Sequence, residues 1–118
     1  MQQRQSLAAI GQRYTDIVWA AGLFEGEGYI YTNPSSKCRC IGIEMTDKDV
    51  MQKYVAVVGY GQLNPRKTVP ANRKQSWRWD IGKRLEVSRI LKMFLPHFGK
   101  RRAEKAIEAI THIHETIN

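Results

Sequence analysis

The sequence is poor in cysteine, histidine and acidic residues, and it contains no long apolar run. Two cysteines, Cys38 and Cys40, and three histidines do not supply the paired ligands of a structural zinc site. On a strand, the spacing of Cys38 and Cys40 lies at the edge of disulfide geometry, so we expect free thiols. No apolar run approaches the about 20 residues of a membrane span, so we expect no membrane partner.

The apolar patch near the start, residues 7–10, is too short for a secretory signal. We therefore expect a cytoplasmic protein, or one of an organelle matrix if the gene is organellar, and not a secreted one. Residues 1–13 are interpreted as a leader, either flexible or adding an extra helical turn. Residues 14–118 then form a single domain with one modest core.

Acidic residues are outnumbered, with 11 Asp and Glu against 19 Lys and Arg, a net charge of +8 and a pI near 9.8. The excess is concentrated rather than scattered: residues 59–81 sum to +4 and residues 82–102 to +6, while residues 103–118 sum to −2. This distribution favours nucleic acid as the partner over a merely solvated basic face.

Apolar periodicity predicts the order α-β-β-α-β-β-α-α. The expected helices cover residues 14–26, 46–58 (with Thr46 as N-cap), about 83–95, and the end of the chain after residue 102. The expected strands cover 29–33, about 37–45, 62 to about 67, and 75–81. The class is α+β: a four-stranded antiparallel sheet with helices on one face and the other face open.

The stretch WAAGLFEGEG, residues 19–28, stands out from this pattern. Gly22 and Gly26 are four apart and share one helix face, where another backbone can approach closely. Glycines at 26 and 28 suit a helix-to-strand turn. Glu25 and Glu27 lie near a helix C-terminus, where the helix dipole opposes an acid, so we expect a cation to offset them.

The residues AAGLFEGEG closely resemble the signature of the LAGLIDADG homing endonucleases. Ala20 stands where that family usually has leucine, Gly22 matches its glycine, and Glu25 and Glu27 replace its two aspartates. The element order also matches that fold over residues 14–115. The resemblance implies that two copies of the helix pack face to face and that the last acid, Glu27, binds a divalent metal. The implied dimer interface comprises Ala21, Gly22, Glu25 and Gly26.

Further stretches carry the resemblance. Thr46-Asp47-Lys48 resembles the step after the second strand, Gly59-Tyr60-Gly61 the glycine-rich return, and Pro96 with Lys100-Arg101-Arg102 the proline and basic cluster before the last helix. The resemblance implies that Asp47 is the polar residue near the cleavage site. It also implies that either Lys100 or Arg101 faces the scissile phosphate.

The open sheet face is expected to recognise double-stranded DNA, since arginine, asparagine and glutamine read base edges. Its members are Tyr29, Tyr31, Asn33, Gln62, Asn64, Arg66, Ser76, Arg78 and Asp80, with Lys67, Arg73 and Lys74 expected to hold phosphates. A simple solvated sheet face is the alternative. Trp77 and Trp79 alternate with Ile81, which favours core positions over base stacking.

These observations lead to one functional hypothesis and two rivals. The hypothesis is a homing-type, site-specific DNA endonuclease of intron or intein mobility that cuts both strands of a long site. A single motif implies a homodimer on a near-palindromic site. Mg²⁺ is the expected cofactor, with Mn²⁺ or Ca²⁺ substituting for binding, and no small-molecule cofactor is expected. The rivals are a catalytically inactive DNA- or RNA-binding module, maturase- or regulator-like, and a basic ribonucleoprotein component.

Overall fold

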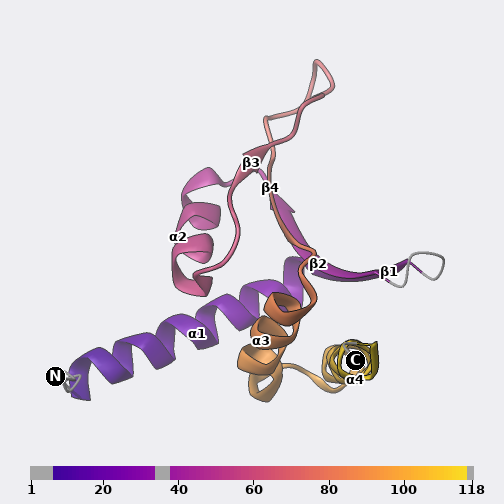
Figure 1. Cartoon of the computed structure of the whole chain (residues 1–118). Coiled ribbons are helices and arrows are strands. Elements are labelled where there is room, and N and C mark those ends of the chain that lie inside the picture. Colours follow the sequence, from indigo (N-terminus) through magenta and orange to yellow (C-terminus); the bar gives the residue numbers. More distant parts are fainter. Residues whose placement is uncertain (1–6, 34–37, 117–118) are drawn as a thin grey trace, which may run out of the picture.

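A computed structural model of the chain describes residues 7–33 and 38–116. Its elements follow one another as α1 (Leu7–Glu27), β1 (Gly28–Asn33), β2 (Cys38–Met45), α2 (Lys48–Val58), β3 (Asn64–Pro65), β4 (Trp77–Ile81), α3 (Arg84–Phe94), the 3-10 turn η1 (Leu95–His97) and α4 (Lys100–Thr116) (Figure 1). The predicted α+β class and element order are confirmed.

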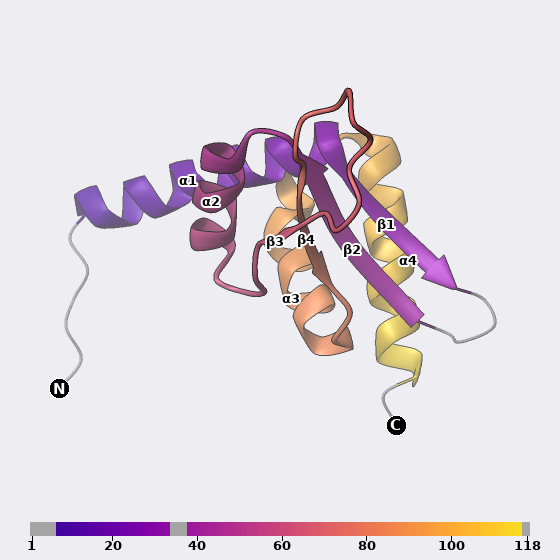
Figure 2. The ribbon, with the colours of Figure 1, turned by 90° about the horizontal axis from the view of Figure 1, so that it is seen from above.

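The strands form one antiparallel sheet in the order β1-β2-β4-β3. Helices lie on one side of this sheet, and its other side carries no helix of the described chain (Figures 1 and 2). Side chains of the two central strands, β2 and β4, alternate between the two faces of the sheet. Ile41, Ile43 and Trp79 are fully buried on the face that the helices cover. Trp79 is therefore a core residue, as its spacing predicted.

The strand register lines up the outward-facing positions across the sheet. Tyr29 of β1 lies opposite Gly42 of β2, and Gly42 lies opposite Asp80 of β4. A side chain at position 42 would collide with the Tyr29 ring, and its Cβ would lie 2.8 Å from the backbone oxygen of Trp79. Glycine at this position therefore lets the Tyr29 ring lie across the middle of the open face.

The first helix is longer at both ends than the sequence predicted. It begins at Leu7, so residues 7–13 extend it by helical turns, and it continues through Gly26 to Glu27. Gly26 is therefore a helical residue, and the described glycines with positive φ are Gly59 and Gly61. Gly28 begins β1 directly, and glycine is required because a Cβ there would lie 2.6 Å from the Phe24 carbonyl oxygen.

The third strand is shorter than predicted, with two residues, Asn64 and Pro65. Proline has no N–H to donate and is confined to sheet edges. Beyond it, pairing continues through the Arg66 N–H, which donates to the Ser76 carbonyl at 3.0 Å. The Gln75 amide also donates to the carbonyls of Arg66 and Ser76, each at 2.9 Å. These bonds close the base of the β3–β4 arm, residues 66–76, which projects from the body (Figure 1).

The fourth strand and the second helix also differ in detail from prediction. β4 begins at Trp77 rather than at residue 75. The N-cap of α2 is Asp47 rather than Thr46, and its side chain makes no capping hydrogen bond. The Asp47 carboxylate is therefore not used by the helix that it precedes. Within residues 7–33 and 38–116, none of the helices has the length and apolarity that a membrane crossing requires.

The closeness of the strands at Gly42 yields a prediction. Gly42→Ala should lower the free energy of unfolding by about 1–3 kcal/mol, because the new methyl group overlaps backbone that cannot yield cheaply. Thermal unfolding followed by circular dichroism should show a midpoint lower by several degrees. Gly82→Ala is the matched control, since a Cβ there meets nothing within 4 Å. Equal midpoints for the two variants would contradict the close approach.

Candidate nucleic-acid interface

An open cleft of about 540 Å³ lies where the end of α1, the end of β2 and the β3–β4 arm meet. It brings together Glu27 and Asp47, two of the residues to which the resemblance gives catalytic roles. The complete lining is Glu27, Glu44, Met45, Thr46, Asp47, Arg66, Val69, Pro70, Arg73, Lys74 and Ser76. Three carboxylates and three cations therefore share one cavity.

The acids of this cleft differ in how they are paired. Glu44 forms ion pairs with Arg66 and Arg78. Among the described residues, Glu27 and Asp47 form no ion pair and no side-chain hydrogen bond. Both are exposed. Their oxygens are thus available to an external ligand, whereas those of Glu44 are engaged within the chain.

Glu25 has a different environment from Glu27, although the two are only two residues apart. Its Oε1 accepts the backbone N–H of Gly99 at 2.9 Å, at the start of α4. Arg102 donates to Glu25 twice, from Nε to the carboxylate at 3.3 Å and from Nη2 to the main-chain oxygen at 3.0 Å. Arg102 is therefore the cation that offsets an acid near the end of α1, and Glu25 joins α1 to α4.

Two residues expected at the dimer interface make contacts within the single chain. Ala21 is fully buried in the subunit core beside Phe24, which corrects its placement on an exposed contact surface. Glu25 is engaged within the chain, as described above. Gly22 and Gly26 are exposed, and a Cβ at either would meet nothing within 4 Å. The glycine face of α1 is therefore open.

The same helix exposes apolar residues before these glycines. Ile10, Tyr14 and Val18 are 49%, 62% and 38% exposed. With Gly22 and Gly26 they form a row of residues spaced by four along α1, called here the α1 row. Rows at this spacing are the ridges through which helices pack against one another.

The basic residues expected to face the scissile phosphate are not in the acidic cleft. Arg101 lines a separate cavity of about 400 Å³, together with Glu25, Gly28, Tyr29, Ile30, Arg102 and Lys105. Lys100 is the exposed first residue of α4 and lines neither cavity. Within a single chain, the cations beside Glu27 and Asp47 are instead Arg66, Arg73 and Lys74.

Most of the residues predicted to face DNA are exposed. They are Tyr29, Tyr31, Gln62, Asn64, Arg66, Lys67, Arg73, Lys74, Arg78 and Asp80, while Ser76 is half-buried. Asn33 ends β1, and its side chain lies outside the described part of the structure. Partial burial, followed by the negative charge of Asp80, raises the pKa of the Tyr29 phenol. The hydroxyl therefore remains protonated at neutral pH and can donate a hydrogen bond.

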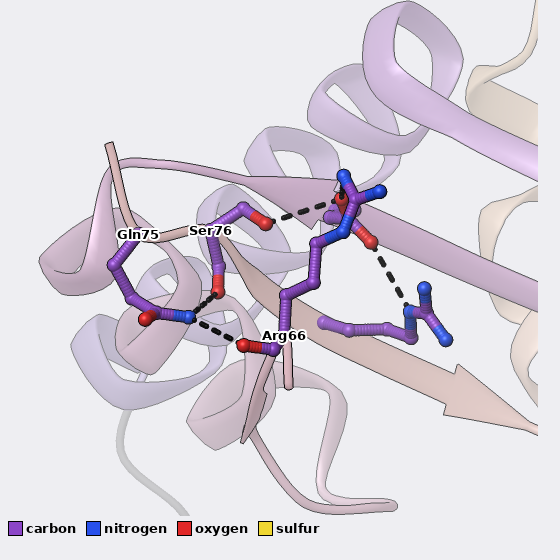
Figure 3. Close-up of polar contacts among 5 residues, drawn as sticks. Arg66, Gln75 and Ser76 are labelled. Atoms are coloured by element: carbon purple, nitrogen blue, oxygen red, sulfur yellow. Dashed lines mark hydrogen bonds and ion pairs between the residues drawn. The ribbon is translucent and has the colours of Figure 1, made fainter. Parts of the chain in front are cut away.

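Sequence reasoning missed Glu44, which lies at the centre of a polar cluster on the sheet. Its carboxylate accepts hydrogen bonds from Arg78 Nε at 3.1 Å, Ser76 Oγ at 3.2 Å and Arg66 Nη1 at 3.4 Å (Figure 3). Glu44 lies directly opposite Arg78 in the strand register. The available signal was that Glu44 alternates onto the same face as the arginines. Its pairing with them depends on the register of β2 against β4, which alternation does not determine.

Comparisons with known proteins identify the fold. No protein-family model and no curated protein matches the chain. Among solved structures, the homing endonuclease I-CvuI in complex with its target aligns with a TM-score of 0.72 and 13% identity over 92% of this chain and 71% of its own. The LAGLIDADG meganuclease I-CpaMI bound to uncleaved DNA aligns with a TM-score of 0.60 and 14% identity over 83% of this chain and 35% of its own.

An archaeal intron-encoded homing endonuclease complexed with DNA, I-Vdi141I, aligns with a TM-score of 0.61 and 12% identity over 86% of this chain and 70% of its own. Identities of 12–14% establish the fold. The chain therefore has the fold of the LAGLIDADG homing endonucleases, as the motif AAGLFEGEG led us to expect.

The structural role of Glu25, which Glu27 lacks, can be tested by measuring the free energy of unfolding. Glu25→Ala should lower the free energy of unfolding by about 1 kcal/mol, because the N–H at the start of α4 loses its acceptor. Glu27→Ala should leave stability unchanged or slightly raised, since it removes an acid opposed by the helix dipole. Urea unfolding followed by circular dichroism measures both. Equal losses would show that Glu27 has a structural role.

Proposed function

We propose that the chain is a divalent-metal-dependent DNA endonuclease of the homing type, which acts as a homodimer and cuts both strands of a long, near-palindromic site. The observation that carries the proposal is the cleft. Two acids without an internal ion pair, Glu27 and Asp47, share it with Arg66, Arg73 and Lys74. It adjoins the exposed polar face of a sheet with the LAGLIDADG endonuclease fold.

The open face has the chemistry of a base-reading surface. Arginine can donate two hydrogen bonds to guanine, and asparagine or glutamine can bond adenine in a bidentate manner. Arg78, Gln62 and Asn64 supply these groups on or next to β3 and β4. Cations of the β3–β4 arm, Lys67, Arg73 and Lys74, are exposed and suit contacts to phosphates, which position a protein without specifying sequence.

The α1 row supports the homodimer. Its last three members, Val18, Gly22 and Gly26, lie on one side of the helix and are exposed in the single chain, which leaves that side open to a partner. Two glycines without neighbours at the Cβ position allow a second α1 to approach closely. An isologous contact along this row relates the two clefts by a two-fold axis, and a two-fold protein matches a near-palindromic site.

The donor set of the cleft fits Mg²⁺. This ion retains several waters and typically uses one or two carboxylates together with substrate phosphates. Glu27 and Asp47 provide two carboxylates, and no cluster of three or more His, Cys, Asp or Glu ligands is found among the described residues. When bound, Mg²⁺ would supply an activated water and neutralise charge on the phosphate, and Mn²⁺ or Ca²⁺ would replace it for binding. Arg73 and Lys74 would attract the DNA backbone toward these acids.

A second candidate function is binding without cleavage. It is favoured by the separation of Arg101 from the acidic cleft, because the basic residue expected at the phosphate is not beside Glu27 in the single chain. A glutamate is also one methylene longer than the aspartate of the LAGLIDADG signature. A DNA- or RNA-binding module of this fold would keep the sheet face and the α1 row while losing catalysis.

Cleavage of a randomised duplex library, with and without Mg²⁺, separates the two candidates. The unchanged protein should cut DNA in Mg²⁺, and Glu27→Gln should slow cutting by more than about a hundredfold while retaining binding, because a metal ligand is lost. Glu108→Gln, an exposed α4 residue, is the matched control and should cut normally. Binding by the unchanged protein without cutting in any divalent ion would favour the non-catalytic module.

The dimer is tested by Gly22→Leu. Leucine has the higher helix propensity by nearly 1 kcal/mol, so the subunit should remain folded. Its side chain would occupy the space that a second α1 needs, and sedimentation should shift toward the monomer. Ala56→Leu adds the same side chain to the exposed surface of α2 and should leave the dimer unchanged. A dimer that persists in Gly22→Leu would place the interface elsewhere.

A further inference from the structure

The Glu44 cluster spans three segments of the sheet. Glu44 belongs to β2, Arg78 to β4, and Arg66 follows β3, so one carboxylate connects three neighbouring segments beside the β3–β4 arm (Figure 3). The Glu44 side chain is 29% exposed, whereas the side chains of Arg66 and Arg78 are 46% and 51% exposed. The acid is therefore more shielded from solvent than either of the arginines that it pairs with.

The atoms used in these bonds determine what remains for a ligand. Arg78 bonds Glu44 through Nε, and that bond leaves its two terminal nitrogens unused. These are the paired donors with which an arginine contacts guanine O6 and N7. Because the guanidinium is planar, fixing Nε also fixes the plane in which the terminal N–H groups lie. Glu44 thus orients Arg78 while leaving its reading edge unoccupied by that bond.

The energetics favour a role in recognition over one in stability. Solvent-exposed ion pairs contribute about 0–1 kcal/mol to folding. An arginine side chain, by contrast, carries about 2 kcal/mol of rotamer entropy, part of which is lost on binding. An arginine already held by Glu44 loses less of it when DNA arrives, which is preorganisation.

The negative charge of Glu44 also affects discrimination. Non-specific DNA affinity grows with the number of cations that neutralise phosphates. A carboxylate between Arg66 and Arg78 weakens their attraction for any phosphate. It does not prevent the directional bonds of Arg78 to a guanine edge. The acid therefore raises the ratio of specific to non-specific binding.

We propose that Glu44 is a specificity-determining positioning residue, which holds Arg78 across β2 and β4 so that Arg78 selects a guanine in duplex DNA. The proposal rests on the proposed DNA-binding function of the open face.

The test is a binding selection from a randomised duplex pool in Ca²⁺. Four proteins are compared: the unchanged chain, Glu44→Gln, Arg78→Lys and the double variant. The unchanged chain should select a guanine at a defined position of each half-site. Each single variant should reduce the preference for that guanine by roughly tenfold, within the range of one bidentate contact. The guanine preference of the double variant should fall no further than that of Arg78→Lys alone, because Glu44 acts through Arg78.

Two further measurements separate positioning from a general change of charge. Glu44→Gln should bind random duplex at least as tightly as the unchanged chain, with a steeper dependence on salt concentration. Glu108→Gln removes the same charge from α4 and should leave the guanine preference intact. Thermal midpoints of all variants should agree within a few degrees, since the pairs are exposed.

Three results would overturn the proposal, and they are distinguishable. If Glu44→Gln binds specifically with an unaltered guanine preference, Glu44 does not position Arg78, but the proposed DNA-binding function is not contradicted. An equal effect of Glu44→Gln in the Arg78→Lys background would mean that Glu44 does not act through Arg78, but holds Arg66 or contacts a base itself, such as the amino group of cytosine. Absence of duplex binding by the unchanged chain would refute the proposed function, and this inference with it.

Discussion

The carboxylate of Glu25 joins the end of α1 to the beginning of α4, and the position of the acidic cleft depends on that connection. α1 passes into β1 without a loop, because Glu27 ends the helix and Gly28 begins the strand. The direction of α1 therefore sets both the edge of the sheet and the place of Glu27. Gly99 and Arg102, which lie 74 and 77 residues further along the chain, donate hydrogen bonds to Glu25 and so fix the direction of α1 at its end. Two glutamates that look equivalent in sequence thus divide into a structural acid and an exposed one.

The same division applies to the acids of the sheet and explains how a strongly basic chain uses its few carboxylates. Glu25 is paired with one arginine and Glu44 with two, whereas Glu27 and Asp47 form no ion pair among the described residues. Glu44 lies between two exposed arginines and orients them at little energetic gain. An acid left unpaired in a cavity lined by cations has oxygens that are available to a metal ion or a water. The paired acids hold arginine side chains in place, and the unpaired acids can bind an external ligand.

The element order and the core can be predicted from the sequence, because both follow from the local spacing of apolar residues. The alternation of Trp77, Trp79 and Ile81 alone is sufficient to predict β4 and its buried face. The role of Glu44 is not accessible in the same way, since its arginine partners lie 22 and 34 residues along the chain and meet it only in the correct register. Ala21 is ambiguous in sequence, because small residues suit either a contact between copies or a tight core. Lys100 and Arg101 cannot be assigned to a cavity from sequence, since the direction of α4 depends on tertiary packing.

The exposed glycines and Glu27 together link the dimer, the metal and the DNA in the proposed enzyme. Glu27 follows Gly26 directly, so two copies of α1 that meet along the α1 row bring two Glu27 carboxylates toward the same axis. At a separation of about 6 Å and an effective dielectric constant near 20, two such charges repel by about 3 kcal/mol. That is a substantial fraction of the about 5–15 kcal/mol that stabilises a small domain. Arg73 and Lys74 reduce this repulsion only in part, because their charges also attract phosphates. In the proposed dimer, a divalent cation held by the Glu27 carboxylates would offset this repulsion, so metal binding would strengthen the contact between the subunits.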